Sequence, residues 1–461
     1  MNICVVCYCK LNDWIFKIQA MAWLDKLKLK KGLVKAANEA GFVAPKEIQQ
    51  KTLARIAGGQ DLIAVGPEGC GKTTTYILAA LNKFNYTPDG VPKVLILVPD
   101  KEKVEEVVAK IDQLNKNASL SIVPLFAAPG TETQMNAIAD GADIVVATPD
   151  RARAIYLKLG LNLNKVDFFA VDDAQLIIKK GLQLPVVELA NSIGRAQHLV
   201  FTEVMHERLE KMLAPFMQMP ATVEVEELPE EQLPVHPQML YHVPNFGTKL
   251  NLLNLFLYDE EMFTKTVVFA NTRLTAETIY KNLTNRLRKA VAMINPLSFE
   301  YNKVNDISEF KADSSLRVLI IANEGTEETE LDLTEIPFII HLDLPADKAV
   351  YIKHIENHTI DAEDETLALT FVTDLELDQV RRIEQTTGQK MQKAELPEDL
   401  VIEKDRKQKE AEKEKAKKPV KADPNQYVPG EAFHEKKPEN SKTYNYSSGT
   451  KAKMNMKKKH G

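Results

Sequence analysis

The residues with the clearest chemical pattern lie between positions 66 and 73. The segment Gly66-Pro67-Glu68-Gly69-Cys70-Gly71-Lys72-Thr73 matches the phosphate-loop pattern G-x-x-x-x-G-K-[ST] in full. Glycines at 66, 69 and 71 would let backbone N–H groups face phosphate oxygens, and the N-terminus of a following helix would add positive partial charge. Lys72 would reach the β- and γ-phosphates, and Thr73 would bind Mg²⁺. The loop therefore predicts a nucleoside-triphosphate site that uses Mg²⁺.

Two aspartates further along the chain could complete this site. Asp172 and Asp173 directly follow the apolar run 167–171. Asp172 would hold Mg²⁺ through water, and Asp173 would orient or deprotonate an attacking water. Lys72, Asp172 and Asp173 are thus the predicted catalytic residues, and Thr73 and Asp172 the predicted metal-binding pair. The alternative interpretation is an aspartate pair that only caps the next helix.

Two series of short apolar runs, with helical patterns between them, must position these residues. The runs of the first series lie at 61–65, 94–98, 121–126, 143–147, 167–171 and 198–201. Those of the second lie at 266–270, 291–294, 317–322, 338–342 and 367–372, with helices expected at 275–287, 348–354 and 377–386. Strands rich in Val, Ile and Leu, separated by helices, indicate a parallel sheet covered on both faces. The predicted fold class is α/β, with two doubly wound parallel-sheet domains.

Composition predicts where the domains begin and end. The expected segments are an extension or misassigned translational start at 1–20, a first domain at 21–221, an acidic linker at 222–237, a second domain at 238–396 and a disordered Lys-rich tail at 397–461. The tail has too few apolar residues to offset chain entropy. Cys4, Cys7 and Cys9 have a spacing that could form part of a metal site, but no complementary Cys or His cluster follows them.

Charge is distributed unevenly along the chain. The net charge is −6, yet residues 403–461 carry 17 Lys/Arg against 9 Asp/Glu. An acidic body with a basic tail would bind a polyanion only through a local groove or through the tail, unless the tail only increases solubility. A 44% hydrophobic composition without a long apolar run excludes a membrane protein. Four cysteines in 461 residues suit a reducing compartment, so a cytoplasmic location is predicted.

The order of several further segments resembles the DEAD-box family of ATP-dependent RNA helicases, over residues 21–390. Segment 41–49 looks like the family's adenine-recognition segment, 97–99 and 147–151 stand where RNA-backbone motifs occur, and 268–273 is similar to the fourth motif. The resemblance implies tandem RecA-like domains that bind ATP, Mg²⁺ and RNA. It assigns nucleotide binding to Gln49, Gly66, Gly69, Gly71, Lys72, Thr73 and Thr74. It assigns RNA contact to Pro99, Thr148, Arg151, Thr272 and Arg273.

Departures from the family pattern concentrate on catalysis and RNA contact. Asp173 stands where the family has a longer glutamate, and an ångström of misplacement can cost about 10²-fold in rate. The family's Ser-Ala-Thr reads Thr202-Glu203-Val204, which adds a negative charge. A glycine pair reads Ala127-Ala128, Lys101 replaces an arginine, and segment 323–330 carries four acidic residues.

The positions of the family's γ-phosphate arginines are also changed. Two of these arginines correspond to His354 and Asn357, and a third nearby arginine corresponds to Ile360. Neither His nor Asn supplies a permanently charged guanidinium. Because an arginine finger is worth roughly 10³–10⁵ in turnover, this loss is the most serious of the departures.

The prediction is therefore a protein that binds ATP, Mg²⁺ and RNA, with hydrolysis and unwinding weak or lost. The first alternative is an active ATP-dependent RNA helicase that remodels short duplexes or ribonucleoproteins. The second is a non-enzymatic scaffold that binds RNA and protein. The expected RNA partner is a single strand or short duplex without sequence preference, and neither DNA specificity nor a membrane is expected. A protein partner on the acidic second domain is a further expectation.

Overall fold

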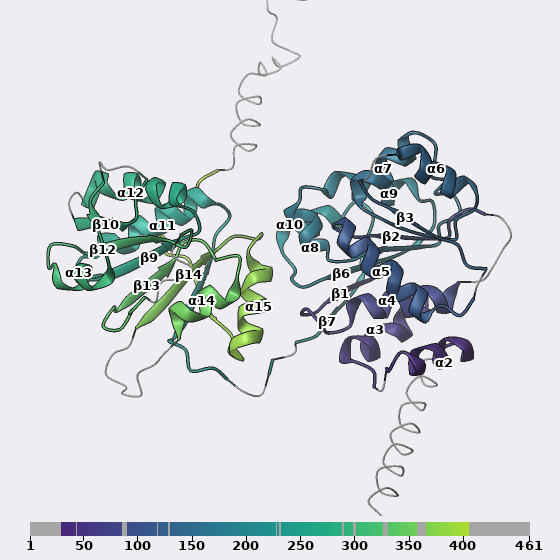
Figure 1. Cartoon of the computed structure of the whole chain (residues 1–461), viewed down its shortest axis with the longest axis horizontal. Coiled ribbons are helices and arrows are strands. Elements are labelled where there is room, and N and C mark those ends of the chain that lie inside the picture. The colour runs from purple at the N-terminus through teal and green to yellow at the C-terminus, as the bar shows by residue number, and fades with distance from the viewer. Residues whose placement is uncertain are drawn as a thin grey trace, which may run out of the picture. The chain divides into compact units, whose positions relative to one another are not determined.

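Two successive α/β domains, each built on one parallel β-sheet, form the described part of the chain (Figure 1). The computed structural model describes residues 29–42, 44–84, 90–117, 119–127, 130–226, 228–229, 232–287, 290–297, 301–325, 331–356 and 366–404. The predicted extension at 1–20 and almost all of the predicted tail lie outside the described residues. The same is true of Ala128, the acidic stretch 326–330, Asn357 and Ile360.

The first domain contains a seven-stranded sheet with the order β3-β4-β2-β5-β6-β1-β7. Its strands are β1 (Leu62–Val65), β2 (Val94–Leu97), β3 (Ile122–Leu125), β4 (Ile144–Ala147), β5 (Phe168–Val171), β6 (Gln197–Thr202) and β7 (Ala221–Glu224). Its helices are α2 (Lys31–Glu39), α3 (Glu47–Ala57), α4 (Lys72–Lys83), α5 (Lys101–Leu114), α6 (Thr131–Ala139), α7 (Pro149–Leu157), α8 (Ala174–Lys179), α9 (Gln183–Ser192) and α10 (Glu207–Leu213).

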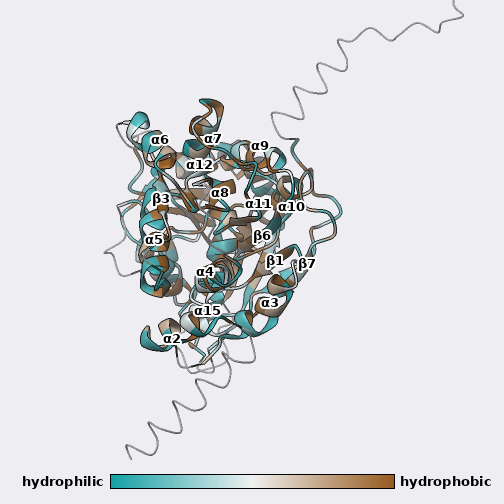
Figure 2. Cartoon of the chain, turned by 90° about the vertical axis from the view of Figure 1, so that its right-hand side faces the viewer, coloured by the Kyte–Doolittle hydropathy of each residue, from teal (hydrophilic) through white to brown (hydrophobic). Residues whose placement is uncertain are grey.

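Both faces of this sheet are buried. Along β1, Leu62 and Ala64 pack in one hydrophobic cluster with residues of α2 to α5, whereas Ile63 and Val65 pack in a second cluster with residues of α7 to α10. Successive strand residues point to opposite faces, so an uninterrupted apolar strand requires helices on both sides. In Figure 2, α5 shows hydrophilic and hydrophobic residues side by side, as expected for a helix with one face on the core. The predicted doubly wound α/β fold is confirmed.

The second domain contains an eight-stranded sheet with the order β11-β10-β12-β9-β13-β14-β8-β15. Its strands are β8 (Gln238–His242), β9 (Thr266–Ala270), β10 (Val291–Ile294), β11 (Lys303–Val304), β12 (Val318–Ala322), β13 (Phe338–His341), β14 (Leu367–Val372) and β15 (Gln392–Ala394). Its helices are α11 (Phe246–Tyr258), α12 (Arg273–Leu287), α13 (Ile307–Ala312), α14 (Lys348–Ile355) and α15 (Leu377–Thr387). The buried strand residues again divide between clusters on the two faces.

Two predicted boundaries differ from the structure. The linker was expected from 222, but β7 continues the first sheet to Glu224 by pairing with β1 in parallel. The tail was expected from 397, but Leu400 packs on the core of the second domain and Glu403 N donates a 3.1 Å hydrogen bond to Thr248 Oγ1. In both places tertiary contacts order a polar segment that shows no clear period. Among the described residues, no helix combines the length and apolarity needed to cross a bilayer.

Candidate functional site

The sequence-predicted residues of the first domain lie along one edge of its sheet. Because the strands are parallel, their carboxyl ends meet at the same edge. The phosphate loop follows β1, Asp172 and Asp173 follow β5, and Glu203 follows β6. Pro99 follows β2 and Thr148 follows β4. The strand order therefore places the phosphate loop and the two aspartates at β1 and β5, Glu203 at β6 between them, and the predicted RNA residues at β2 and β4.

The phosphate loop has the backbone that its glycines predict. Gly69 and Gly71 have φ values of 81° and 100°, in the left-handed region that favours glycine. A Cβ on Gly66 would lie 2.7 Å from Cys70 Sγ, so this position also needs glycine. Lys72 Nζ donates hydrogen bonds to the carbonyl oxygens of Gly66 at 2.7 Å and Pro67 at 2.8 Å. The ammonium group thus lies inside the curve of the loop, at the start of α4.

The upstream segment packs against this loop. Gln49 Oε1 accepts a 3.1 Å hydrogen bond from Lys46 N, and Lys46 Nζ donates to the carbonyl of Gly69. A Cβ on Gly71 would lie 3.2 Å from Gln49 Nε2, which shows how closely the two segments approach. The structure thus brings Gln49 beside the phosphate loop, and its role in base recognition stays a prediction.

Asp172 is fully buried at the end of β5 and is held by two hydroxyl groups of α4. Its Oδ2 accepts hydrogen bonds from Thr73 Oγ1 at 3.0 Å and from Tyr76 OH at 2.9 Å. Burial raises the pKa of Asp172, the neighbouring Asp173 raises it further, and Lys103 and Lys72 oppose the shift. The predicted metal pair Thr73 and Asp172 is therefore assembled, and Tyr76 fixes the carboxylate from a second side.

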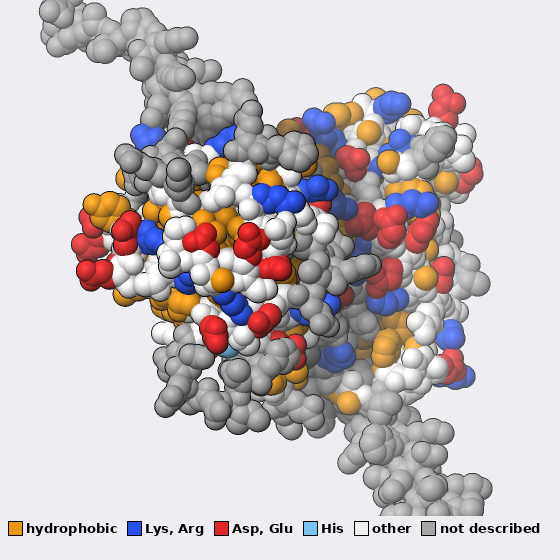
Figure 3. Space-filling view, turned by 60° about the vertical axis from the view of Figure 1, so that its left-hand side comes forward, with side chains coloured by type: hydrophobic (Ala, Val, Ile, Leu, Met, Phe, Trp, Pro, Cys, Tyr) orange, Lys and Arg blue, Asp and Glu red, His pale blue; other side chains and the backbone are white. Residues whose placement is uncertain are grey.

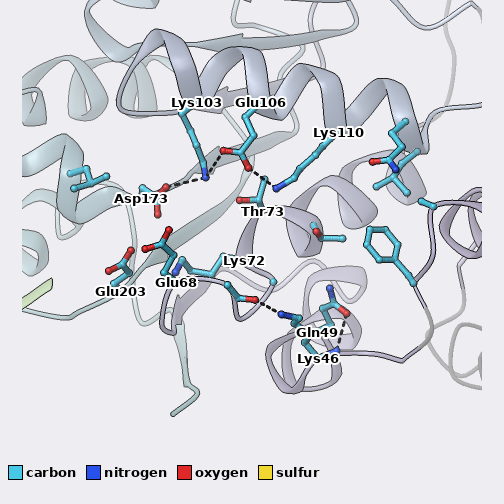
Figure 4. Close-up of a pocket in the computed structure, with 18 of the residues that line it drawn as sticks. Lys46, Gln49, Glu68, Lys72, Thr73, Lys103, Glu106, Lys110, Asp173 and Glu203 are labelled. Carbon is cyan, nitrogen blue, oxygen red and sulfur yellow. Dashed lines mark hydrogen bonds and ion pairs between the residues drawn. The ribbon is translucent and has the colours of Figure 1, made fainter. Parts of the chain in front are cut away.

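Asp173 begins α8 with a left-handed backbone, φ 48°, and faces a charged side chain of α5. Lys103 Nζ lies 3.3 Å from Asp173 Oδ2 and 3.1 Å from Glu106 Oε2. Lys110 Nζ in turn lies 2.5 Å from Glu106 Oε1. Figure 4 shows these groups along one wall of a pocket whose other walls carry Lys46, Gln49 and Thr73. The pocket measures about 640 Å³, within the range of small-molecule sites.

Gln175 and Thr202 connect the β5 and β6 ends of the edge. Gln175 Oε1 accepts hydrogen bonds from Thr202 Oγ1 at 2.9 Å and from Glu203 N at 3.2 Å. The Glu203 side chain is 3% exposed, and Arg382 Nη2 of α15 lies 3.0 Å from its Oε1. The additional carboxylate noticed in the sequence is therefore neutralised by a guanidinium group that also lines the pocket.

The predicted RNA residues of the first domain are arranged around the start of α7. Thr148 is the residue before this helix, and its side chain is buried. Arg151 Nε donates a 2.8 Å hydrogen bond to Gln134 Oε1 of α6. Pro99 lies two residues after β2, and its carbonyl oxygen accepts a 3.2 Å hydrogen bond from Lys180 Nζ. The structure gathers these three residues on neighbouring strand ends, and contact with RNA stays a prediction.

The predicted RNA residues of the second domain follow β9. Thr272 Oγ1 accepts a 3.1 Å hydrogen bond from Thr275 N, and Arg273 N donates a 3.0 Å hydrogen bond to Glu324 Oε2. Glu324 belongs to the acidic segment 323–330 and follows β12, the strand beside β9. An acidic side chain is thus in direct contact with the backbone of a predicted RNA residue.

His354, at a predicted γ-phosphate position, lies inside the second domain. Its ring stacks on Phe269 with centroids 3.8 Å apart, and its Nδ1 is 3.3 Å from His341 Nε2. Burial lowers the pKa of His354 to about 4, so the ring is neutral at pH 7. Arg317, also in the second domain, pairs with Glu260 at 2.9 Å. Neither side chain presents positive charge to the pocket.

Three residues of the site were missed by sequence reasoning. Tyr76, Lys103 and Arg382 lie 4, 31 and 310 positions from Lys72 in the sequence. Tyr76 carried a usable signal, because a tyrosine one helical turn after Thr73 lies on the same face of α4. Lys103 and Arg382 carried none, since a lysine or arginine on a helix is usually a solvated residue.

The residues present fit a magnesium nucleotide. Hydroxyl and carboxylate oxygens are the ligand types that Mg²⁺ takes, and they converge where Thr73 meets Asp172. Lysine, a glycine loop in the left-handed conformation and a helix N-terminus form a phosphate-binding arrangement. Fold and site together define a protein with two tandem RecA-like α/β domains, the first of which carries a phosphate loop.

Comparisons with known proteins specify the family. A family model described as "DEAD/DEAH box helicase" matches residues 46–213. The chain is 26% identical over 380 residues to "ATP-dependent RNA helicase eIF4A" of Candida albicans. The aligned region covers 82% of this chain and 92% of that protein. It is 26% identical over 376 residues to "ATP-dependent RNA helicase DeaD" of Buchnera aphidicola, covering 80% of this chain and 60% of the relative.

Among solved structures, a DEAD box protein from the hyperthermophile Methanococcus jannaschii is 21% identical, with a TM-score of 0.43 and coverage of 80% of this chain and 97% of that one. The family-model match and the sequence relatives confirm the resemblance found in the sequence. Residues 46–213 thus match the DEAD/DEAH box helicase family, and the chain is similar to DEAD-box RNA helicases over about four-fifths of its length.

Proposed function

We propose that this protein binds Mg·ATP in the first domain and RNA across the carboxyl edges of its sheets, with ATP hydrolysis and unwinding that are weak or absent. The observation that carries this proposal is the contrast between a complete phosphate loop and the buried, neutral His354 at the arginine-finger position. ATP binding needs the phosphate loop. Fast hydrolysis needs a positively charged side chain at the position that His354 occupies.

Each residue of the first domain has a defined part in binding. Lys72 would exchange its bonds to the loop carbonyls for bonds to the phosphates, and Gln49 would orient the base. Thr73 and Asp172 would hold Mg²⁺, which when bound would neutralise developing charge on the phosphates. Asp173 is the residue that would accept a proton from water, but it is paired with Lys103 at 3.3 Å.

One observation favours an active ATPase as the second candidate function. Arg382 lines the pocket and already pairs with Glu203, so a guanidinium group is present from another helix. Its side chain lies 3.6 Å from Glu68 Oε2 of the phosphate loop. If this group served the γ-phosphate, Arg382→Ala would abolish turnover while leaving ATP affinity nearly unchanged. Phosphate release from ATP, with and without single-stranded RNA, therefore distinguishes the two candidates.

Arg151 provides a test of the proposed RNA contact. Arg151→Ala should weaken binding of a single-stranded oligonucleotide and lower the salt dependence, log affinity against log salt, by about one unit. Fluorescence anisotropy of a labelled oligouridine across a salt series measures both quantities. Arg153→Ala is the matched control, because Arg153 lies on the same helix but pairs with Glu188. Equal effects of the two variants, or none from Arg151→Ala, would contradict a phosphate contact at Arg151.

The distribution of charged residues supports two further proposals about binding partners. The Lys-rich tail would add sequence-independent RNA affinity because lysines neutralise phosphates and its aromatic residues can stack on bases, without preference for DNA. A protein partner would bind the acidic second domain. Figure 3 shows that acidic and basic side chains alternate over the visible described surface, so such a partner would need charges of both signs. We place the protein in the cytoplasm.

A further inference from the structure

An ammonium group on α5 lies within the carboxylate cluster of the pocket. Lys103 is 3.3 Å from Asp173 and 3.1 Å from Glu106, and its side chain is only 21% exposed (Figure 4). Asp173 precedes α8, at the end of the strand that carries Asp172. Lys103 is therefore a partly buried cation beside the two aspartates that were predicted for metal binding and catalysis.

The backbone of Lys103 is fixed by a helix cap. Asp100 is the residue before α5, and its carboxylate accepts a 2.9 Å hydrogen bond from Lys103 N. Lys180 Nζ lies 2.9 Å from the other oxygen of Asp100 and holds that carboxylate in turn. The position from which the Lys103 side chain extends is thus set by two further interactions.

The charged end of Lys103 is fixed as well. Glu106, its partner one turn along α5, is held by Lys110 at 2.5 Å, so charges alternate from Asp173 through Lys103 and Glu106 to Lys110. Asp173 N also donates a 3.0 Å hydrogen bond to Asp172 Oδ1, which joins the two aspartates. The ammonium group of Lys103 therefore lies between two carboxylates, those of Asp173 and Glu106.

Two adjacent carboxylates repel each other and any polyphosphate that enters the pocket. A divalent cation is one remedy, and a lysine tethered to a rigid helix is another that needs no bound ion. We propose that Lys103 is a resident counter-ion of the Asp172–Asp173 pair, so that this protein binds adenine nucleotides with little dependence on Mg²⁺. This inference rests on the proposed nucleotide binding, and it specifies how the nucleotide affinity of that site depends on Mg²⁺.

The test is the affinity for ATP and for ADP in excess MgCl₂ and in EDTA, measured by isothermal titration calorimetry on the full chain. For the unaltered protein the two conditions should differ by less than about 3-fold. Lys103→Met, which keeps the length of the side chain, should lose about 10-fold in EDTA but stay within about 3-fold in MgCl₂, where the metal replaces the lost charge. Metal dependence thus should emerge only when Lys103 is removed.

Two further variants separate charge balance from other effects. Lys103→Met/Asp173→Asn removes both members of the pair and should regain most of the affinity lost in EDTA. If it does not regain it, Lys103 acts on the phosphates directly and the counter-ion proposal is wrong. Lys116→Met is the matched surface control, since Lys116 is 54% exposed and pairs with Glu39. Circular dichroism melting curves verify that each variant is folded.

The outcomes also separate this inference from the proposed function. Tight binding that requires Mg²⁺ in the unaltered protein would overturn the role of Lys103 and leave nucleotide binding standing. Absence of binding in both conditions would overturn both proposals. Equal metal dependence in the unaltered protein and in Lys103→Met would overturn the counter-ion role alone.

Discussion

Replacement of Lys72 by alanine should lower the affinity for ATP about 100-fold, because hydrogen bonds to charged groups contribute roughly 1.5–3 kcal/mol each and the ammonium group can make two to the phosphates. Its two present acceptors, the carbonyls of the buried Gly66 and Pro67, also lose their partner in this variant, so its melting curve is compared with that of the unaltered protein. Isothermal titration calorimetry with ATP and MgCl₂ measures the loss.

The control for this variant is Lys51→Ala. Lys51 lies on α3, two residues after Gln49, and forms an exposed pair with Glu47. Its replacement should leave ATP affinity within about 2-fold. An unchanged affinity in Lys72→Ala, with the melting curve also unchanged, would mean that the nucleotide does not bind at this loop.

Acidification from pH 7 to pH 5 should destabilise the second domain through His354 and His341. Burial lowers the pKa of His354 to about 4, and that of His341 is lowered well below its usual value by burial and by His354. Both rings therefore stay neutral in the folded state while the unfolded chain takes up protons below pH ~6.5. The free energy of unfolding is therefore unaffected by these groups above that pH and decreases as the pH falls toward 4. At pH 5 the decrease is about 2 kcal/mol for His354 alone.

The matched variant is His341→Phe/His354→Phe. It keeps the ring stack with Phe269 and removes both members of the 3.3 Å histidine pair together, so no single partner is left unpaired. Urea unfolding followed by circular dichroism at pH 7 and pH 5 should show a much smaller pH effect than in the unaltered chain. A pH effect of the same size in both proteins would contradict the buried neutral pair.

The central strands could be predicted from sequence because a short uninterrupted apolar run, bounded by polar residues, is typical of a strand buried on both faces of a sheet. All five runs of the second series fall on β9, β10, β12, β13 and β14. The strands that were missed lie near the sheet edges or join the linker: β7, β8, β11 and β15. These strands are short and polar, as in Gln392–Ala394, or alternate polar with apolar residues. Pairing with a neighbouring strand of the sheet therefore stabilises them more than their own sequence does.

The site was predictable where chemistry resides in a contiguous motif. Gly66 to Thr73 and the Asp172–Asp173 pair could be found because their spacing is fixed by one loop and one strand end. Lys103 and Arg382 could not, because their approach to the pocket depends on where α5 and α15 pack. His354 was recognised as a lost arginine, but its burial against Phe269 follows from the packing of α14 on the sheet.

The most direct test of the account is phosphate release from saturating ATP by the full chain, with and without single-stranded RNA. Lys72→Ala sets the background, and calorimetry on the same samples verifies that ATP is bound. We expect a rate within about 2-fold of that background, with or without RNA, while ATP stays bound, because the arginine-finger position holds the buried, neutral His354. Release that RNA stimulates tenfold or more above the background, and that Arg382→Ala removes, would contradict it and establish an active ATPase.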